Sequence, residues 1–207
     1  MIVIGITGGT GSGKGFVCER FTKYNINSLD TDIVSRSVCY AGSDCLDELV
    51  SYFGSQILNE DGTLNRKLLA NIAFTDKEKH SALNSITHKY ILKEICNWIN
   101  TQKKAGAKYA IVDAPMLFES GTDKLCDVII SVIASEEIRI QRVLKRDNIH
   151  IDEVKNRIKR QHDDEFYIKN SDYTITNDGD TVSLDKQIDI IYNSITNLEK
   201  TKNDTEA

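Results

Sequence analysis

The sequence predicts an α/β fold, a doubly wound parallel sheet of five strands with a helical insertion. Five short runs rich in β-branched residues alternate with segments of helical spacing, and residues 109–113 and 128–133 are nearly continuous apolar runs. Such runs are typical of parallel strands that are covered on both faces. Between residues 33 and 106 the strand signal is weak and apolar residues recur at helical spacing, which predicts the insertion after the second strand.

The elements follow one another in a simple order. Residues 2–6 predict a buried strand that ends at a Gly-rich turn, residues 14–24 a helix, and residues 26–29 a second strand. The insertion spans about 33–106, and the third and fourth strands follow it. A charged helix pair at 136–146 and 152–161 belongs to a lid region of about 139–170. A last strand at 173–175, a helix near 183–198 and a polar tail at 200–207 complete one domain, whose core is about 1–32, 107–138 and 171–199.

Composition excludes several classes of protein. The 207-residue chain has 26 Lys and Arg against 31 Asp and Glu, a net charge of −5, and an isoelectric point near 5.4. This balance argues against bulk nucleic-acid binding, which usually needs a basic surface. We see no signal-peptide pattern and no apolar run near the ~20 residues of a membrane span, so the sequence predicts a soluble cytoplasmic protein without a membrane partner. The five scattered cysteines favour reduced thiols over a disulfide framework or zinc site, and the oligomeric state stays open.

A Gly-rich segment between the first strand and the first helix is the strongest functional signal. It reads Gly8-Gly-Thr-Gly-Ser-Gly-Lys14 and matches the first seven positions of the phosphate-binding pattern GxxxxGK followed by Ser or Thr. Glycines let several backbone N–H groups point at one phosphate chain, the helix start favours an anion, and Lys14 adds a full charge. The alternative is a Gly-rich turn with a surface lysine, but strand, spacing and helix all favour nucleotide phosphates.

One position of this loop breaks the pattern. Residue 15 is Gly, where a Ser or Thr hydroxyl normally ligates Mg²⁺, and residue 16 is Phe. The predicted nucleotide site comprises Gly11, Ser12, Gly13, Lys14, Gly15 and Phe16.

Two carboxylates are expected near the loop. Asp32 follows the second strand, and Asp113 ends the third strand in the manner of a Walker B residue. We expect Asp113 to lie near the metal and to contact it through water. Ligands of open parallel sheets gather at the carboxyl ends of strands, where a carboxylate can accept the proton of an attacking hydroxyl. For Asp32 the alternative is an N-cap of the next helix.

Taken in order, the motifs resemble those of the dephospho-coenzyme A kinases over nearly the whole chain. The matching segments are 6–14, 29–32 with Arg36, 53–54, 61–66, 86–88, 112–119, 141–147 and 177–179. The resemblance implies a P-loop kinase fold with a helical substrate-binding insertion and a helical lid. It also implies ATP-dependent phosphorylation of the ribose 3′-hydroxyl of dephospho-coenzyme A, with ATP and Mg²⁺ as cofactors.

The resemblance also implies roles for single residues. Asp32 matches the general base and also contacts the substrate, together with Arg66 and His88 of the insertion, and Asn177 lies near the adenine. The sequence departs from the family at Gly15 and Phe16, where Ser-Thr is usual, at Asn65, where Asp is usual, and at Lys89, where Pro is common.

Three arginines share one face of the predicted lid helix, because Arg139, Arg142 and Arg146 are spaced i, i+3 and i+7. Such a face can neutralise charge on the transferred phosphoryl group. The resemblance, through its motif at 141–147, implies a catalytic role for Arg142 and a nucleotide contact for Arg146, and it favours Arg139 less. For all three arginines the alternative is a solvated helix face with Glu136, Glu137 and Asp147 as partners.

Two other functions compete with an active kinase. One is a nucleotide-binding pseudokinase, which Gly15 alone supports, and the other is a kinase of the same fold that acts on another nucleoside or metabolite.

Overall fold

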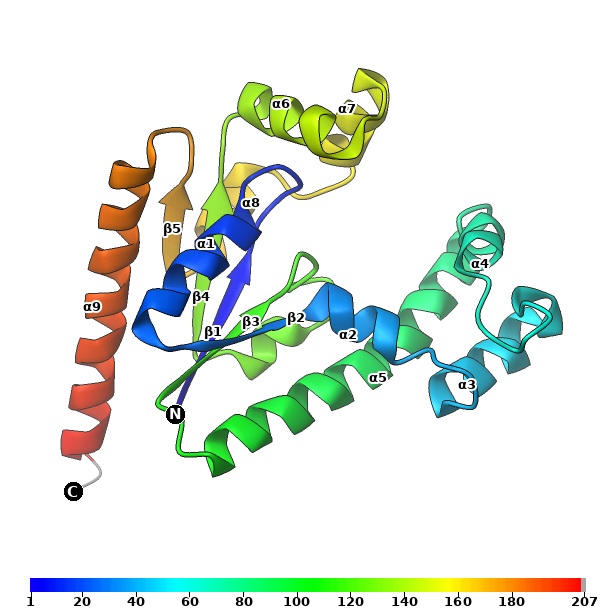
Figure 1. Cartoon of the computed structure of the whole chain (residues 1–207), viewed down its shortest axis with the longest axis horizontal. Helices are drawn as coiled ribbons and strands as arrows, with labels where there is room; N and C mark the ends of the chain where they lie inside the picture. The colour runs from blue at the N-terminus through cyan, green and yellow to red at the C-terminus, as the bar shows by residue number, and fades with distance from the viewer. Residues whose placement is uncertain (206–207) are drawn as a thin grey trace. The chain divides into compact units, whose positions relative to one another are not determined.

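The computed structural model describes residues 1–205, with side chains up to Asn197, and contains a five-stranded sheet, whose strands are drawn as arrows in Figure 1. The strands are β1 (Ile2–Thr7), β2 (Asn27–Asp30), β3 (Tyr109–Asp113), β4 (Val128–Ile133) and β5 (Tyr173–Thr176). Their order is β2-β3-β1-β4-β5, with β1 parallel to β3 and β4, and β4 parallel to β5. The chain starts at the centre and builds first toward one edge and then toward the other, which confirms the predicted doubly wound sheet.

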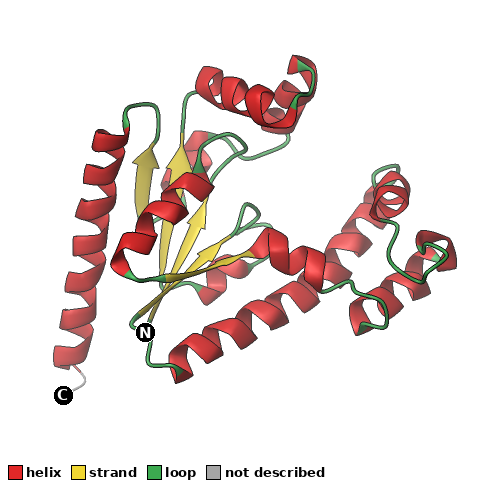
Figure 2. Cartoon of the chain, viewed as in Figure 1, coloured by secondary structure: helices red, strands yellow, loops and turns green. Residues whose placement is uncertain are grey.

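The chain divides into two compact units, each described here by itself. The first comprises Met1–Leu29 and the chain from Gln102 onward, and the second is Asp30–Thr101. The strands, which are yellow in Figure 2, belong to the first unit, apart from Asp30 at the end of β2. The helices of the first unit are α1 (Lys14–Phe21), η1 (Thr22–Tyr24), η3 (Thr122–Leu125), α6 (Glu136–Asp147), α7 (Ile151–Lys159), α8 (Asp164–Lys169) and α9 (Thr181–Thr205).

Alternate residues of β1 face opposite sides of the sheet. Ile4 and Ile6 belong to the main core cluster, to which α1 contributes Phe21 and α9 contributes Ile188. On the other face, a Cβ atom at Gly5 would lie 2.8 Å from the Cys126 sulfur. Both faces are therefore covered, which explains why every residue of β1 is buried.

The second unit is helical. It contains α2 (Thr31–Ser37), α3 (Asp44–Phe53), η2 (Ser55–Ile57), α4 (Arg66–Ala73) and most of α5 (Lys77–Lys104). Side chains cap these helices as their sequences favour, since Ser43 accepts from the Leu46 N–H and Asn65 accepts from the Leu68 N–H. Leu49 and Ile57 are fully buried in this unit.

The structure differs from the prediction in two places. The short helix α8 was not predicted, because six residues are too few to show a helical period. The sequence predicts that the last helix ends near residue 198, whereas α9 continues to Thr205 into the predicted polar tail at 200–207, of which residues 206–207 lie outside the described part of the chain. Within the described residues, none of the helices is sufficiently long and apolar to cross a membrane.

Candidate active site

The Gly-rich loop joins β1 to α1, as predicted, and two of its glycines are required by close contacts. Gly13 has φ 89° and forms the N-cap of α1, and a Cβ atom there would lie 2.1 Å from Asn177 Nδ2. Gly11 has φ 80°, and its Cβ atom would lie 2.5 Å from the Arg139 carbonyl oxygen. Left-handed backbone and close packing together explain why no side chain is present at these positions.

Donors from distant parts of the chain hold the loop carbonyls. Arg142 Nη1 donates to the carbonyls of Gly11 (3.3 Å) and Ser12 (3.1 Å), and Asn177 Nδ2 donates to the Ser12 carbonyl at 2.7 Å. Arg142 Nη2 also donates to the Asn177 carbonyl at 2.8 Å. Because the carbonyls face these donors, the amide side of the loop and the start of α1 are left to face an anion.

A second anchor lies at the tip of the loop. The Thr10 N–H donates to Gln161 Oε1 at 2.7 Å, and Arg139 Nε donates to the Thr10 carbonyl at 2.9 Å. Arg139 is only 5% exposed, so the solvated-face interpretation of this residue is wrong. Its guanidinium also lies 3.7 Å from Asp164, whose carboxyl pKa is raised by burial despite the opposing effect of Arg139.

We expect Arg139→Met to destabilise the protein, because the Thr10 carbonyl and Gln161 lose a buried charged donor. The free energy of unfolding in urea should fall by about 2 kcal/mol. Lys145→Met is the matched control, since Lys145 is an exposed cation on the same helix, and it should change stability by less than about 0.5 kcal/mol. Equal losses in the two variants would contradict the proposed anchor.

Lys14 and Asp113 meet at the base of the loop. Lys14 Nζ donates to Asp113 Oδ1 and forms an ion pair with it. The carboxylate ends β3 and the lysine begins α1, so both lie at the carboxyl edge of the sheet. The pair places one cation and one anion beside the loop, where a phosphate chain and a bound metal would need them.

Two hydroxyl groups fit the same interpretation. Thr7 Oγ1 and Ser12 Oγ are buried and lack a hydrogen-bond partner among the described residues. Buried polar groups normally have partners, so these two atoms indicate that something polar belongs beside the loop. These hydroxyls and the Asp113 carboxylate are all oxygen donors, the ligand type that suits Mg²⁺.

A pocket of about 310 Å³ opens on the helix side of the loop. It is lined by Gly13, Phe16, Arg142, Asn177, Gly179 and Asp180, among others. The motif at 177–179 predicts Asn177 as a site residue. It does not predict that Asp180 and the start of α9 line this pocket.

In the second unit, the alternative role of Asp32 can be tested directly. Asp30, and not Asp32, is the N-cap of α2, because Asp30 Oδ1 accepts from the Asp32 N–H at 2.8 Å. The exposed carboxylate of Asp32 therefore has no capping role. Elsewhere in this unit Arg66 Nη2 donates to the Arg36 carbonyl at 2.6 Å, and His88 is half-buried on α5.

A family model for dephospho-CoA kinase matches residues 2–183. The chain belongs to the dephospho-CoA kinase family. A dephospho-CoA kinase from Corynebacterium efficiens is 38% identical over 189 residues, which cover 91% of this chain and 94% of that protein. A crystal structure of a protein from Thermus thermophilus has a TM-score of 0.80 at 26% identity and covers 93% of this chain and 97% of its own. The dephospho-CoA kinase structure from Campylobacter jejuni has a TM-score of 0.70 at 23% identity, covers 95% and 98%, and supports the fold.

These matches confirm the P-loop kinase fold and the predicted family. As a member of the dephospho-CoA kinase family, the chain is an ATP-dependent kinase. The loop with Lys14 and Asp113 is the candidate site of the first unit.

This chain departs from the family's usual sequence at residues 15, 16 and 65. A Cβ atom at Gly15 would meet nothing within 4 Å, and the Phe16 ring is 39% exposed with the Arg20 guanidinium carbon 4.8 Å from its centre. Phe16 therefore does not crowd residue 15. Asn65 replaces Asp as the N-cap of α4 without loss, because the two residues cap helices equally well.

The side chain of Arg146 contacts Asp147 and not the Gly-rich loop. Its side chain is 63% exposed and donates from Nε and Nη2 to the neighbouring Asp147, which also accepts from Arg157. The hydrogen bond from Arg146 is the main cause that lowers the pKa of the Asp147 carboxyl. Of the three arginines on this helix face, Arg139 and Arg142 contact the loop in this structure, whereas Arg146 is held at a neighbouring carboxylate.

Proposed function

We propose that this chain transfers the γ-phosphoryl group of ATP to the ribose 3′-hydroxyl of dephospho-coenzyme A, the last step of coenzyme A synthesis. The observation that carries this proposal is the phosphate loop, which is held by Arg142 and Asn177 and flanked by Lys14 and Asp113 in a chain of this family. The products are coenzyme A and ADP.

We assign the acceptor chemistry to Asp32. Its carboxylate takes the proton of the 3′-hydroxyl as that oxygen bonds to the γ-phosphorus, and the bond from the γ-phosphorus to the bridging oxygen of ADP breaks. Arg66 and His88 bind the substrate in the same unit. The exposed carboxylate at the start of α2 supports the assignment, because Asp30 already caps that helix.

We assign the nucleotide to the loop residues 11–16, with Asn177 near the adenine and Arg146 as a nucleotide contact of the lid. Lys14 binds the terminal phosphates once it leaves Asp113. Arg142 neutralises charge on the transferred group, and to do so its guanidinium has to leave the carbonyls of Gly11 and Ser12. A cytoplasmic location and the lack of a nucleic-acid partner remain predictions from the sequence.

Mg²⁺ would be held by oxygen donors near Asp113, Thr7 and Ser12, with Asp113 as an outer partner through water. When bound, Mg²⁺ neutralises phosphate charge during transfer. It commonly keeps several waters, so a further water can replace the hydroxyl that residue 15 lacks.

We expect Gly15→Ser to lower the Mg²⁺ concentration that gives half the maximal rate. The new hydroxyl supplies the missing ligand, and the space around residue 15 is open. Initial rates measured over a Mg²⁺ titration at saturating ATP provide the test. Gly15→Ala is the matched control, because it adds the Cβ atom and helix propensity without the hydroxyl. Equal shifts in the two variants would show that the hydroxyl is not the cause.

The function itself is tested by a coupled ADP-release assay with dephospho-coenzyme A, ATP and Mg²⁺. The proposal expects turnover that depends on all three. ATP binding without turnover at saturating Mg²⁺ would favour the pseudokinase, and turnover with adenosine but not with dephospho-coenzyme A would favour a different metabolite kinase.

A further inference from the structure

Cys39 and Cys45 of the second unit lie next to each other, although they are six residues apart and form no Cys-x-x-Cys motif. The sulfur atoms of Cys39 and Cys45 are 3.3 Å apart. Both residues are buried, with 6% and 1% of their surface exposed. A disulfide needs a sulfur separation of about 2.05 Å, so a small movement of the two side chains would suffice to join them.

The connection between the two cysteines allows such a movement. Cys39 follows the C-cap of α2, and Cys45 is the second residue of α3. Between them Gly42 has φ 82°, and nothing lies within 4 Å of the position of its absent Cβ atom. A short turn that is open around Gly42 thus joins the two helix ends.

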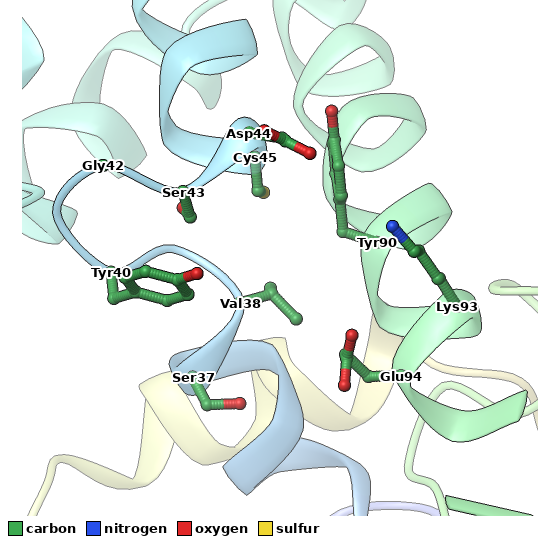
Figure 3. Close-up of a pocket in the computed structure, with 10 residues that line it drawn as sticks. All are labelled: Ser37, Val38, Tyr40, Gly42, Ser43, Asp44, Cys45, Tyr90, Lys93 and Glu94. Carbon is green, nitrogen blue, oxygen red and sulfur yellow. The ribbon is translucent and has the colours of Figure 1, made fainter. Parts of the chain in front are cut away.

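A pocket gives small molecules access to the pair. It measures about 500 Å³, and Figure 3 shows that side chains of the α2–α3 connection and of α5 face each other across it. Cys45 is among the lining residues, together with Ser43, Tyr90 and Lys93. Cys45 is therefore shielded from bulk water but borders a space large enough for a small ligand, and Cys39 lies directly behind it.

Chemistry at the pair favours the thiolate. A hydrogen bond from the Cys45 thiol is the main cause that lowers the pKa of Cys39 to about 7, and the Arg66 guanidinium lowers it further against the effect of burial. The same hydrogen bond raises the pKa of Cys45. Near neutral pH one proton of the pair is readily lost, and the thiolate is the form that attacks disulfides.

We propose that Cys39 and Cys45 are a modification site, a dithiol that forms a reversible intrachain disulfide by exchange with a low-molecular-weight disulfide entering this pocket. Disulfides of cytosolic proteins are usually transient and redox-sensing, which is the behaviour expected of this pair. The exchange requires neither ATP nor dephospho-coenzyme A, so it does not depend on the proposed kinase reaction.

The exchange has two balanced steps. In the first, the thiolate of the pair attacks one sulfur of the small disulfide, whose sulfur–sulfur bond breaks, and one small thiolate leaves and takes up a proton. In the second, the remaining cysteine loses its proton and attacks the protein sulfur of the mixed disulfide, which releases the second small thiol. Two protein thiols are oxidised and one small disulfide is reduced.

The test uses the full chain and 2-hydroxyethyl disulfide, a small uncharged probe, because the pocket is lined by groups of both charges. After incubation near pH 7.5, intact mass should show the loss of two hydrogen atoms, and peptide mapping should join Cys39 to Cys45. Dithiothreitol should restore the original mass. Stable addition of the probe without the loss of two hydrogens, or a bond between other cysteines, would overturn the proposal.

Variants sharpen this test. Cys39→Ser and Cys45→Ser should each abolish the loss of two hydrogens and retain at most a mixed disulfide. Cys96→Ser is the matched control, because Cys96 is half-buried on α5 and lies outside the pair, and it should be oxidised as fully as the parent. If Cys39→Ser is still oxidised by two hydrogens, the pair is not the site. The mapped bond in the parent protein decides the question even if a variant fails to fold.

Discussion

Lys14→Ala is expected to abolish phosphoryl transfer, with turnover lowered by about 10³-fold or more, and to weaken ATP binding. Lys14 is the single charged residue between Gly8 and Gly15. Its loss leaves the phosphate chain with backbone N–H groups and the start of α1, which hold partial charges. The measurements are kcat at saturating substrates and the ATP dissociation constant by calorimetric titration. Unchanged affinity together with an unchanged rate would contradict the assignment of the phosphate loop.

The ion pair with Asp113 requires a control for folding. Removing Lys14 leaves a carboxylate that is mostly buried without this cation, and an uncompensated buried charge is destabilising. The double variant Lys14→Ala/Asp113→Asn removes the orphaned charge as well. It should be more stable in urea than Lys14→Ala but should bind ATP no more tightly. This result would distinguish a loss of folding stability from a loss of nucleotide binding.

The fold was largely readable from the sequence because parallel strands leave a local signal. Strands β3 and β4 are buried on both faces, and their apolar runs predicted them at the residues where they occur. Helix α8 left no such signal, since Tyr167 is buried under the sheet by contacts that a run of six residues does not reveal. The sequence predicts a helix near 183–198, whereas α9 continues to Thr205, because polar residues do not show the apolar period that indicates a helix.

The candidate site was readable only in part. A local motif identified Lys14 and the loop glycines, since spacing alone fixes their place between a strand and a helix. The anchors were not readable, because Arg139 meets Thr10 across 129 residues of sequence and Gln161 meets it across 151. Helical spacing places Arg139, Arg142 and Arg146 on one face, but it does not show that the third is held by its sequence neighbour Asp147.

Asp32→Asn is expected to lower kcat by about 10²–10⁴-fold, with little change in the ATP dissociation constant. Asparagine keeps the size and hydrogen-bonding capacity of the side chain but cannot accept the proton of the 3′-hydroxyl. Steady-state rates at saturating ATP and dephospho-coenzyme A, together with ATP titration, measure the two effects separately. A variant that keeps most of its activity would remove Asp32 from the chemistry.

Asp30→Asn completes this experiment, because the two aspartates are two residues apart and differ in role. Asp30 caps α2, and Asn caps helices as well as Asp does, so the helix should keep its stability and the enzyme most of its rate. A loss confined to Asp32→Asn then follows from the proton acceptor and not from the cap. Equal losses in both variants would mean that negative charge at the start of the helix, shared by the two carboxylates, is what the reaction needs.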